Sequence, residues 1–297
     1  MSHPARQRPW TIQQLLQWTQ GFFADKGIDT PRLDAELLLA HALGVQRIVL
    51  YTSFDKPLRP EERQVFREYV KRRAQREPVA YILGEREFYG RSLRVAPGVL
   101  IPRPETEHLV DRALSWLREQ ELKAPEILDI GTGTGAIAVS LAAEVPEARL
   151  VATDISETAL SFARANAEQH GVSDRTELIR GANFEPVAQR RFHLIVSNPP
   201  YVETHTQAEL QAEVAVHEPA EALFAGADGL DVLRVVSREA PAHLYPGGLL
   251  AMEVGAGQAA DVCEMLQRAG FTSVHTESDL QGHARVVAGV HPGRPGG

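Results

Sequence analysis

The spacing of apolar residues changes along the chain. Up to residue 85, apolar positions recur every three or four residues, which is typical of amphipathic helices packed around a small core. Capping residues and helix breakers predict where these helices begin and end. Helices are expected from Thr11 to Gly27, from Pro31 to Gly44 and from Pro60 toward Arg76. Residues 1–85 are therefore predicted to form an all-helical domain.

Beyond Pro104, short apolar runs alternate with helical patterns. Strands are expected at residues 127–130, 150–153, 177–179, 193–197, 249–254, 272–276 and 284–289. This alternation is typical of an α/β fold, and it predicts a Rossmann-like, doubly wound, seven-stranded sheet in residues 104–290. Residues 86–103 are predicted to be a linker with a hairpin, because Glu87 to Val95 alternates apolar and polar side chains. Residues 291–297, rich in proline and glycine, are predicted to be a disordered tail.

Composition limits the class of protein. With 297 residues, of which 43% are hydrophobic, the chain is long enough for two cores. A single cysteine, Cys263, excludes a disulfide framework and a thiolate-rich metal site, and a packing role is expected for it. The sequence has neither a run of about 20 apolar residues nor the apolar core of a signal peptide. A soluble, cytoplasmic protein without a membrane partner is expected.

Charge is distributed unevenly between the two predicted parts. Residues 1–85 hold 13 Lys and Arg against 10 Asp and Glu, whereas the remainder holds 18 against 29, a net charge of −11. An acidic domain is poorly suited to binding duplex DNA, so no direct nucleic-acid partner is expected. The short basic run Lys71-Arg72-Arg73 is interpreted as a helix end whose cations complement the helix dipole.

A glycine-rich turn follows the first predicted strand of the larger part. The turn reads Gly131-Thr132-Gly133-Thr134-Gly135, and the next strand ends in Asp154, about 20 residues further on. In a βαβ nucleotide-binding unit, an acidic residue at that position binds ribose hydroxyls. The glycine spacing is not that of a dinucleotide-binding turn, and no phosphate-binding lysine follows. The pattern therefore favours S-adenosylmethionine, which has a ribose and no phosphate, over NAD or ATP.

The run Asn198-Pro199-Pro200-Tyr201 directly follows another predicted strand and suits methylation of a planar nitrogen. A nitrogen conjugated to a carbonyl or a ring is a poor nucleophile, so a catalyst must hold its N–H groups and aim its lone pair. The Asn198 side-chain oxygen and the Pro199 carbonyl are two candidate acceptors, and Pro200 stiffens the backbone. Tyr201 offers a flat face on which the planar group can stack. All four residues are candidates for substrate binding, and Asn198, Pro199 and Tyr201 for catalysis.

Four candidate site residues follow the carboxyl ends of predicted strands, namely Gly131, Asp154, Phe184 and Asn198. Ligands of open α/β sheets bind at that edge, so these residues are expected to share one crevice. Other chemistries find less support, because the 11 histidines show no metal-ligand spacing and no serine elbow or Cys-His pairing stands out. No metal site is expected. Glu105 is either an acid near the site or a favourable residue in the first turn of a helix, and the role of Arg103 is equally open.

Taken together, these motifs resemble those of class I S-adenosylmethionine-dependent methyltransferases that act on planar nitrogens. Further stretches resemble the peptide chain release factor glutamine methyltransferase family. They are Glu77–Gly84, Phe88–Gly90, Ile101–Glu107, Glu218-Pro219 and Ala222-Leu223. The resemblance covers residues 10–290. It implies that the sheet closes with an antiparallel pair between Gly270 and Gly289.

The resemblance also implies an activity, a substrate and binding roles. The expected reaction is methylation of N5 of the glutamine in the Gly-Gly-Gln loop of bacterial class I release factors, by a monomer whose N-terminal helices contact the substrate. Asn183 or Phe184 would flank the adenine, and Asn198 would border the cofactor. Gly226 to Asp231 is either a loop near the site or a plain turn. The alternatives are a ribosomal protein glutamine methyltransferase, an N6-adenine methyltransferase, which the acidic domain disfavours, and a non-catalytic translation-factor binding module, which the intact motifs disfavour.

Overall fold

The computed structural model describes residues 10–279 and 281–292, so most of the predicted tail lies outside the described residues. The chain forms two compact units. The helical unit contains the residues up to Gly84 together with Ala212–His217, and the sheet unit contains Glu85–Gln211 and the residues from Glu218 onward. The sequence did not indicate that Ala212–His217 belongs with the helices, because this segment lies inside the stretch that alternates helices and strands.

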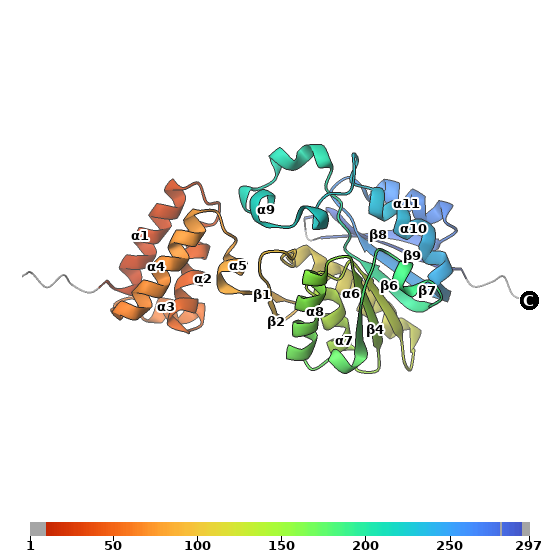
Figure 1. Ribbon diagram of the computed structural model, residues 1–297, viewed down its shortest axis with the longest axis horizontal. Helices are drawn as coiled ribbons and strands as arrows, with labels where there is room; N and C mark the ends of the chain where they lie inside the picture. The colour runs from red at the N-terminus through yellow and green to blue at the C-terminus, as the bar shows by residue number, and fades with distance from the viewer. Residues whose placement is uncertain (1–9, 280, 293–297) are drawn as a thin grey trace, which may run out of the picture. The chain divides into compact units, whose positions relative to one another are not determined.

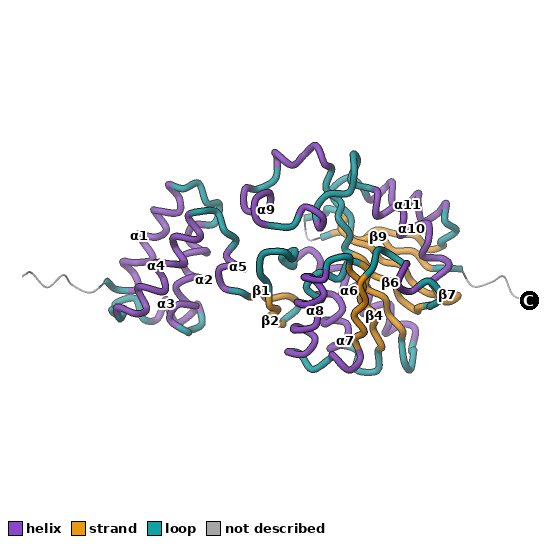
Figure 2. Tube along the Cα trace, viewed as in Figure 1, coloured by secondary structure: helices purple, strands orange, loops and turns teal. Residues whose placement is uncertain are grey.

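Five helices precede the sheet unit in the described part of the chain. They are α1 (Ile12–Asp25), α2 (Pro31–Leu43), α3 (Arg47–Thr52), α4 (Pro60–Ala74) and α5 (Val79–Leu83) (Figures 1 and 2). Helix α1 begins with a capping box, in which the Thr11 hydroxyl and the Gln14 side chain each bond the other's backbone N–H. The three predicted helices are present. The short helices α3 and α5 lack a recognisable periodicity and were not predicted.

Buried charges join the later segment to the helical unit. The segment contains α9 (Ala212–His217), whose Glu213 accepts hydrogen bonds from Arg73 at 2.9 Å and from Arg76 at 3.1 Å. Arg73 is itself buried and also donates to Asp34 at 2.6 Å. Buried charges are tolerated when they are paired and hydrogen-bonded, as they are in this cluster. The basic run near residue 72 is therefore partly a buried ion-pair site and not only a solvated helix end.

The predicted hairpin is present and begins two residues earlier than expected. Strands β1 (Glu85–Phe88) and β2 (Arg91–Arg94) pair antiparallel, with Glu85 opposite Arg94. The two turn residues, Tyr89 and Gly90, both have positive φ, as a tight two-residue hairpin turn requires.

Seven strands form the main sheet in the order β5-β4-β3-β6-β7-β9-β8 (Figure 1). Their bounds are Glu126–Ile130 (β3), Arg149–Asp154 (β4), Thr176–Arg180 (β5), Phe192–Ser197 (β6), Leu244–Glu253 (β7), Thr272–Ser278 (β8) and Ala284–Val290 (β9). The strands from β5 to β7 run parallel, and β9 runs antiparallel to both β7 and β8. This confirms the doubly wound sheet and its antiparallel closing pair. The strand order reverses between β3 and β6, where open α/β sheets bind ligands.

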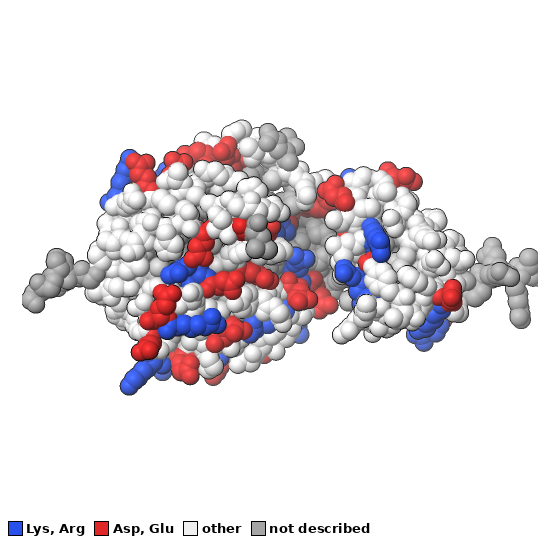
Figure 3. Space-filling view, turned by 180° about the vertical axis from the view of Figure 1, so that it is seen from behind, with Lys and Arg blue, Asp and Glu red and all other residues white. Residues whose placement is uncertain are grey.

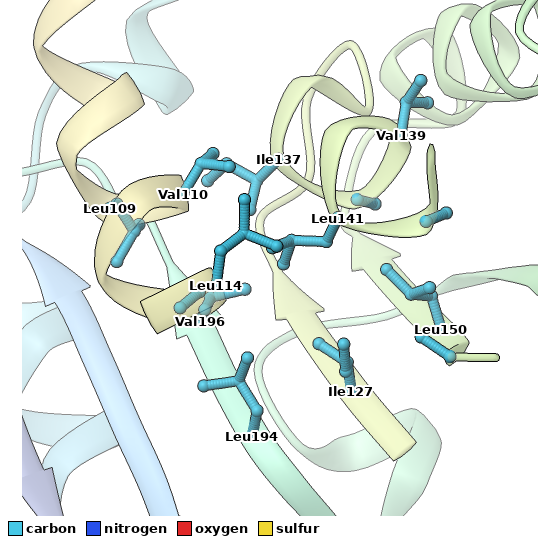
Figure 4. Packing of buried hydrophobic residues seen from close by; sticks show 14 of the residues in the cluster. Leu109, Val110, Leu114, Ile127, Ile137, Val139, Leu141, Leu150, Leu194 and Val196 are labelled. Atoms are coloured by element: carbon cyan, nitrogen blue, oxygen red, sulfur yellow. The ribbon is translucent and has the colours of Figure 1, made fainter. Parts of the chain in front are cut away.

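Helices cover both faces of this sheet. One face packs against α6 (Glu107–Gln120), α7 (Ala136–Glu144) and part of α8 (Glu157–Gln169), and the other against α10 (Asp231–His243) and α11 (Ala259–Arg268). Side chains alternate between the two faces along each strand, as the strand period requires. On β3, Ile127 packs on the first face and Leu128 on the second. Figure 4 shows the first cluster, in which leucines of α6 and α7 meet the side chains of β3, β4 and β6.

Strand β7 starts at Leu244, five residues earlier than predicted from the apolar run alone. Pro246-Gly247-Gly248 has the sequence of a turn, but Leu244 pairs with Phe192 and the register shifts between Phe192 and Leu194. A bulge of this kind accommodates residues that local pattern excludes from a strand. Among the described residues, no helix combines the length and the apolar character that crossing a membrane requires.

Candidate active site

A cavity of about 460 Å³ lies at the carboxyl ends of the central parallel strands. Its lining includes the predicted residues Gly131, Thr132, Gly133, Thr134, Asp154, Asn183, Asn198, Pro199 and Pro200. These residues end or follow strands β3, β4, β5 and β6, so the sheet brings four separate segments to one place. Gly135, Phe184 and Tyr201 were also predicted at the site, but they do not line this cavity.

The glycine turn is held by the neighbouring strand. Gly131 and Thr132 donate their backbone N–H groups to the Thr153 carbonyl at 2.9 and 3.0 Å. Gly135 is needed for packing, since a Cβ built there would lie 3.1 Å from the Cα of Ala163 in α8. The last glycine of the turn therefore lets α7 and α8 approach closely, and the earlier residues face the cavity.

Asp154 fixes the shape of this turn as well as lining the cavity. Its Oδ2 accepts the Gly133 N–H at 2.9 Å, and its Oδ1 accepts the Ser156 N–H at 2.9 Å. Burial raises the pKa of the Asp154 carboxyl, while the backbone donors counteract that shift. Each carboxylate oxygen has a second lone pair, so the group can still accept hydrogen bonds from a ligand's hydroxyls.

Asp129 is a second buried acid beneath the turn. It is completely buried, and burial raises its pKa to about 7. The Thr132 hydroxyl donates to its Oδ2 at 2.6 Å, while Oδ1 has no hydrogen-bond partner among the described residues. The signal available in the sequence was an acidic residue within the apolar run Ile127–Ile130, two positions before the turn begins at Gly131.

Asn198 has a fixed partner on one side of its amide. Its Nδ2 donates to the Thr106 hydroxyl at 3.1 Å, which leaves Oδ1 as the acceptor for a bound group. Thr106 also lines the cavity and is buried, on the short 3-10 helix η1 (Pro104–Thr106). Sequence reasoning missed Thr106, because a threonine beside two glutamates shows no signal until the fold places it against Asn198.

Tyr201 lies outside the lining of this cavity. Its half-buried ring packs against the core cluster that also includes residues of α10 and α11, and its hydroxyl donates to Glu253 at 3.3 Å. Burial and the neighbouring Glu253 carboxylate raise the pKa of the Tyr201 hydroxyl. The side chain therefore anchors the loop that carries Asn198, and it does not present its flat face to this cavity.

Phe184 is also placed differently from one of the two expectations. Its ring is buried and stacks on His243, with centroids 4.5 Å apart and planes 9° apart. Asn183 lines the cavity instead, in a left-handed backbone conformation with φ of 48°. Of the two candidates for flanking the adenine, only Asn183 lies on the cavity wall.

An ion pair joins two segments of the cavity wall. Glu218 is buried and accepts hydrogen bonds from the Arg103 guanidinium at 2.5 Å and from the Ile101 N–H at 3.2 Å. It thereby ties Ile101–Thr106 to the segment Pro219–Phe224, and both segments contribute lining residues. The role left open for Arg103 is thus a structural contact with Glu218, whereas Glu105 does not line the cavity.

Comparison with known proteins identifies the family. A family model described as "PrmC N-terminal domain" matches residues 14–84, and one described as "Methyltransferase small domain" matches residues 110–243. A release factor glutamine methyltransferase of Geobacter sulfurreducens is 48% identical over 280 residues, which cover 94% of this chain and 96% of that protein. One of Rhodopirellula baltica is 44% identical over 294 residues, covering 97% and 99%. The chain belongs to the release factor glutamine methyltransferase family.

Solved structures place this family member in the methyltransferase fold. The hMettl16 catalytic domain in complex with MAT2A 3′UTR hairpin 6 has a TM-score of 0.56 at 17% identity, covering 69% of this chain and 77% of that chain. A methyltransferase from Pyrococcus furiosus has a TM-score of 0.50 at 19% identity, covering 69% and 90%. At these identities the likeness shows the fold alone, which is Rossmann-like.

The cofactor of this release factor glutamine methyltransferase family member is S-adenosylmethionine. The cavity fits it, because its volume is within the range of small-molecule sites and its described lining holds no lysine or arginine to bind a phosphate. Asp154 would hold the ribose, the turn from Gly131 to Thr134 would lie along the amino-acid part, and Asn183 would border the adenine. Asp154 and Asn183 both line the cavity and are polar.

The loop after Phe224 packs closely against the segment that begins at Asn198, so a larger side chain in this loop is expected to reduce stability. A Cβ at Gly229, where φ is +70°, would lie 2.2 Å from the Tyr201 carbonyl oxygen. Gly229→Ala is expected to lower Tm by more than about 5 °C and to reduce the methylation rate, because the backbone of the loop must move. Thermal unfolding and initial rates at saturating cofactor measure both effects.

Gly247→Ala is the matched control for this substitution. Gly247 has φ of +84°, but a Cβ added there would meet no described atom within 4 Å beyond its chain neighbours. Alanine at this position therefore carries only the cost of the left-handed backbone. A Tm decrease of roughly 2–4 °C is expected for it, with normal activity. Equal effects of the two variants would contradict the close packing of Gly229 on the loop.

Proposed function

We propose that this protein transfers a methyl group from S-adenosylmethionine to N5 of the glutamine in the Gly-Gly-Gln loop of bacterial class I peptide release factors. The observation that carries the proposal is the amide of Asn198, which is held by Thr106 on one side and borders the cofactor cavity with Pro199 and Pro200. The names of the relatives, which are release factor glutamine methyltransferases over nearly their full length, support the substrate.

The mechanism follows from the weak nucleophilicity of an amide nitrogen. Its lone pair is delocalised into the carbonyl, so the nitrogen must be held where the pair meets the acceptor carbon. The Asn198 Oδ1 and the Pro199 carbonyl can accept its two N–H groups, which fixes the plane of the amide and increases electron density on nitrogen. Prolines at 199 and 200 restrict the backbone, so this geometry is preorganised.

The chain's own residues need no strong base for this step. When bound, S-adenosylmethionine supplies an electrophilic methyl group on a sulfonium. The Asn198 and Pro199 oxygens carry partial negative charge toward the nitrogen, which becomes positive as the new bond forms, and such preorganised dipoles account for much of the barrier reduction. After transfer, the extra proton leaves the nitrogen along the hydrogen bond to one of these oxygens and passes to water.

The proposal extends to the partner, the cellular location and the oligomeric state. A monomer in the cytoplasm would meet release factors directly, and the helical unit would add contacts to the substrate. Figure 3 shows basic and acidic side chains interspersed on the viewed face of the sheet unit, without a continuous basic stripe there. A ribosomal protein glutamine and an adenine in DNA are the other substrates against which the proposal is tested.

The test is methyl transfer from radiolabelled S-adenosylmethionine to purified substrates. We expect label on recombinant release factor and none on the same factor whose loop glutamine is replaced by alanine. Ribosomal proteins and adenine-containing DNA serve as competing acceptors. Label on one of these in place of the release factor would overturn the substrate, while absence of label on all four would overturn the activity.

A further inference from the structure

A buried carboxylate lies behind the Asn198–Thr106 hydrogen bond. Glu253, the last residue of β7, is 2% exposed. The Tyr201 hydroxyl donates to its Oε1 at 3.3 Å, and the Thr106 hydroxyl interacts with the same carboxyl and lowers its pKa. Its Oε2 has no hydrogen-bond partner among the described residues. The reaction as described above makes no use of this buried acid.

The direction of the hydrogen bonds in this chain is determined by the carboxylate. An ionised carboxylate can only accept, so Thr106 must direct its single proton toward Glu253. The Thr106 oxygen is then left with lone pairs alone, and only a donor can face it from Asn198. That donor is Nδ2, at 3.1 Å, so the amide cannot rotate to bring Nδ2 into the cavity.

The orientation of Asn198 decides which side chain the cavity accepts. With Oδ1 toward the cavity, the site receives the N–H groups of a glutamine and repels the acceptor oxygens of a glutamate. With Nδ2 toward the cavity, this preference reverses, because the site offers a donor. Hydrogen bonds that are left unmade in a buried site discriminate strongly between such near-isosteric groups.

We propose that Glu253 is a positioning residue that, through Thr106, holds the Asn198 amide in the orientation that selects glutamine over glutamate. This inference rests on the proposed function and deepens it. Glu253 contacts neither substrate nor cofactor in this scheme. It acts by fixing the direction of two hydrogen bonds, which requires an acceptor at its position.

The surroundings of Glu253 determine when it is ionised. Burial is the main cause that raises its pKa to about 7, and Glu105 on η1 raises it further. The hydroxyls of Thr106 and Tyr201 and the guanidinium of Arg285 on β9 act in the opposite direction. The carboxylate therefore titrates near neutrality, and the relay works in its ionised form above that pH.

The first test compares two substitutions of Glu253. Glu253→Met removes the acceptor, so Thr106 can donate to Asn198 Oδ1 and the amide can rotate. Glu253→Gln keeps an acceptor oxygen for the Tyr201 and Thr106 hydroxyls. We expect Glu253→Met to reduce the preference for glutamine about tenfold or more, and Glu253→Gln to retain most of it.

The preference is measured as binding, independently of turnover. Calorimetry in the presence of S-adenosylhomocysteine gives the affinity for intact release factor and for release factor with glutamate in place of the loop glutamine. For Glu253→Met, weaker binding of the glutamine form and tighter binding of the glutamate form would support the inference. An unchanged ratio, or equal weakening of both forms, would overturn it.

Thr106 provides an independent pair of variants. Thr106→Val removes the hydroxyl with little change of shape, and Thr106→Ser keeps it. The valine variant is expected to lose the glutamine preference as Glu253→Met does, while serine restores it. Loss of preference in both variants, or in neither, would contradict the relay.

The pH dependence supplies a further readout. At saturating cofactor, the wild-type kcat is expected to rise with pH through a midpoint of about 7 and then level off. Glu253→Gln should abolish this rise of kcat with pH, since the amide does not titrate. Glu105→Gln should shift the midpoint of the rise to lower pH by removing a like charge. A rise of kcat with pH that persists unchanged in Glu253→Gln would overturn the assignment of this titration to Glu253.

Stability separates positioning from a merely structural role. The pKa of Glu253 is raised above its ordinary value of 4.5, so folding favours the protonated form and stability falls as pH rises from about 4.5 to 7. Glu253→Met is therefore expected to raise Tm more at pH 8 than at pH 5, while it lowers glutamine selectivity. A wild-type protein that neither binds nor methylates release factor would overturn the proposed function. If the wild-type protein is active and the Glu253 and Thr106 variants keep its preference for glutamine, this inference alone is overturned.

Discussion

Replacement of Asn198 by alanine is expected to lower kcat by about 10²- to 10³-fold, the cost of removing one preorganised polar contact to the reacting group. The amide of the substrate then loses an acceptor for one N–H, and the nitrogen lone pair is no longer held in line with the methyl group. Thr106 keeps its interaction with the Glu253 carboxyl. Affinity for S-adenosylmethionine should change little.

Steady-state kinetics and calorimetry together test this expectation. Asn183→Ala is the matched truncation, because Asn183 lines the cavity beyond a different strand. It is expected to raise the KM for the cofactor and to leave kcat at saturation close to normal. A large loss of cofactor affinity in Asn198→Ala with normal turnover would disprove the catalytic role of Asn198.

Asp154→Ala is expected to have the opposite effect, weakening S-adenosylmethionine binding roughly 100-fold, on the scale of two lost hydrogen bonds to a charged group. Two causes add in this variant. The ribose hydroxyls lose their acceptor, and the Gly133 N–H, at 2.9 Å from Oδ2, loses the contact that shapes the glycine turn. The kcat at saturating cofactor should fall much less than the affinity.

Cofactor titration by calorimetry measures the change. Glu221→Ala serves as a comparison, because Glu221 lines the cavity and raises the pKa of Asp154 but accepts no hydrogen bond from the glycine turn. A much smaller change is expected for it. Equal losses in the two variants would mean that Asp154 acts through its negative charge alone and not through its defined contacts.

The two buried acids near the cavity show how the fold trades stability for function. Asp129 and Glu253 each have an oxygen without a partner among the described residues, and burial raises the pKa of each to about 7. Unpaired buried carboxylates reduce stability, so their presence beside a ligand cavity is informative. Asp129 supports the glycine turn through Thr132, and Glu253 supports the Asn198 side through Thr106.

Much of the fold could be predicted because it follows from local patterns. Strands β3 to β6 are short apolar runs bounded by polar or glycine residues, and their alternation with helices allows few topologies. Helices α1 and α2 carry recognisable caps, Thr11 and Gly44. Where local pattern was misleading, as at the start of β7, the Pro246–Gly248 stretch forms a bulge and Leu244 still pairs with β6 on its other side.

The fold class, the family and the chemistry at the strand ends could all be inferred from the chain alone, because the turn from Gly131, Asp154 and the Asn198-Pro199 pair are each contiguous signals. Which side chains face the cavity could not be inferred in this way. Tertiary packing buried Phe184 in the core, packed the half-buried Tyr201 against it, and placed Thr106 and Glu253 behind Asn198. The physical reason is that hydrogen bonds between residues distant in the chain leave no local pattern, so they are determined by how the strands and helices pack.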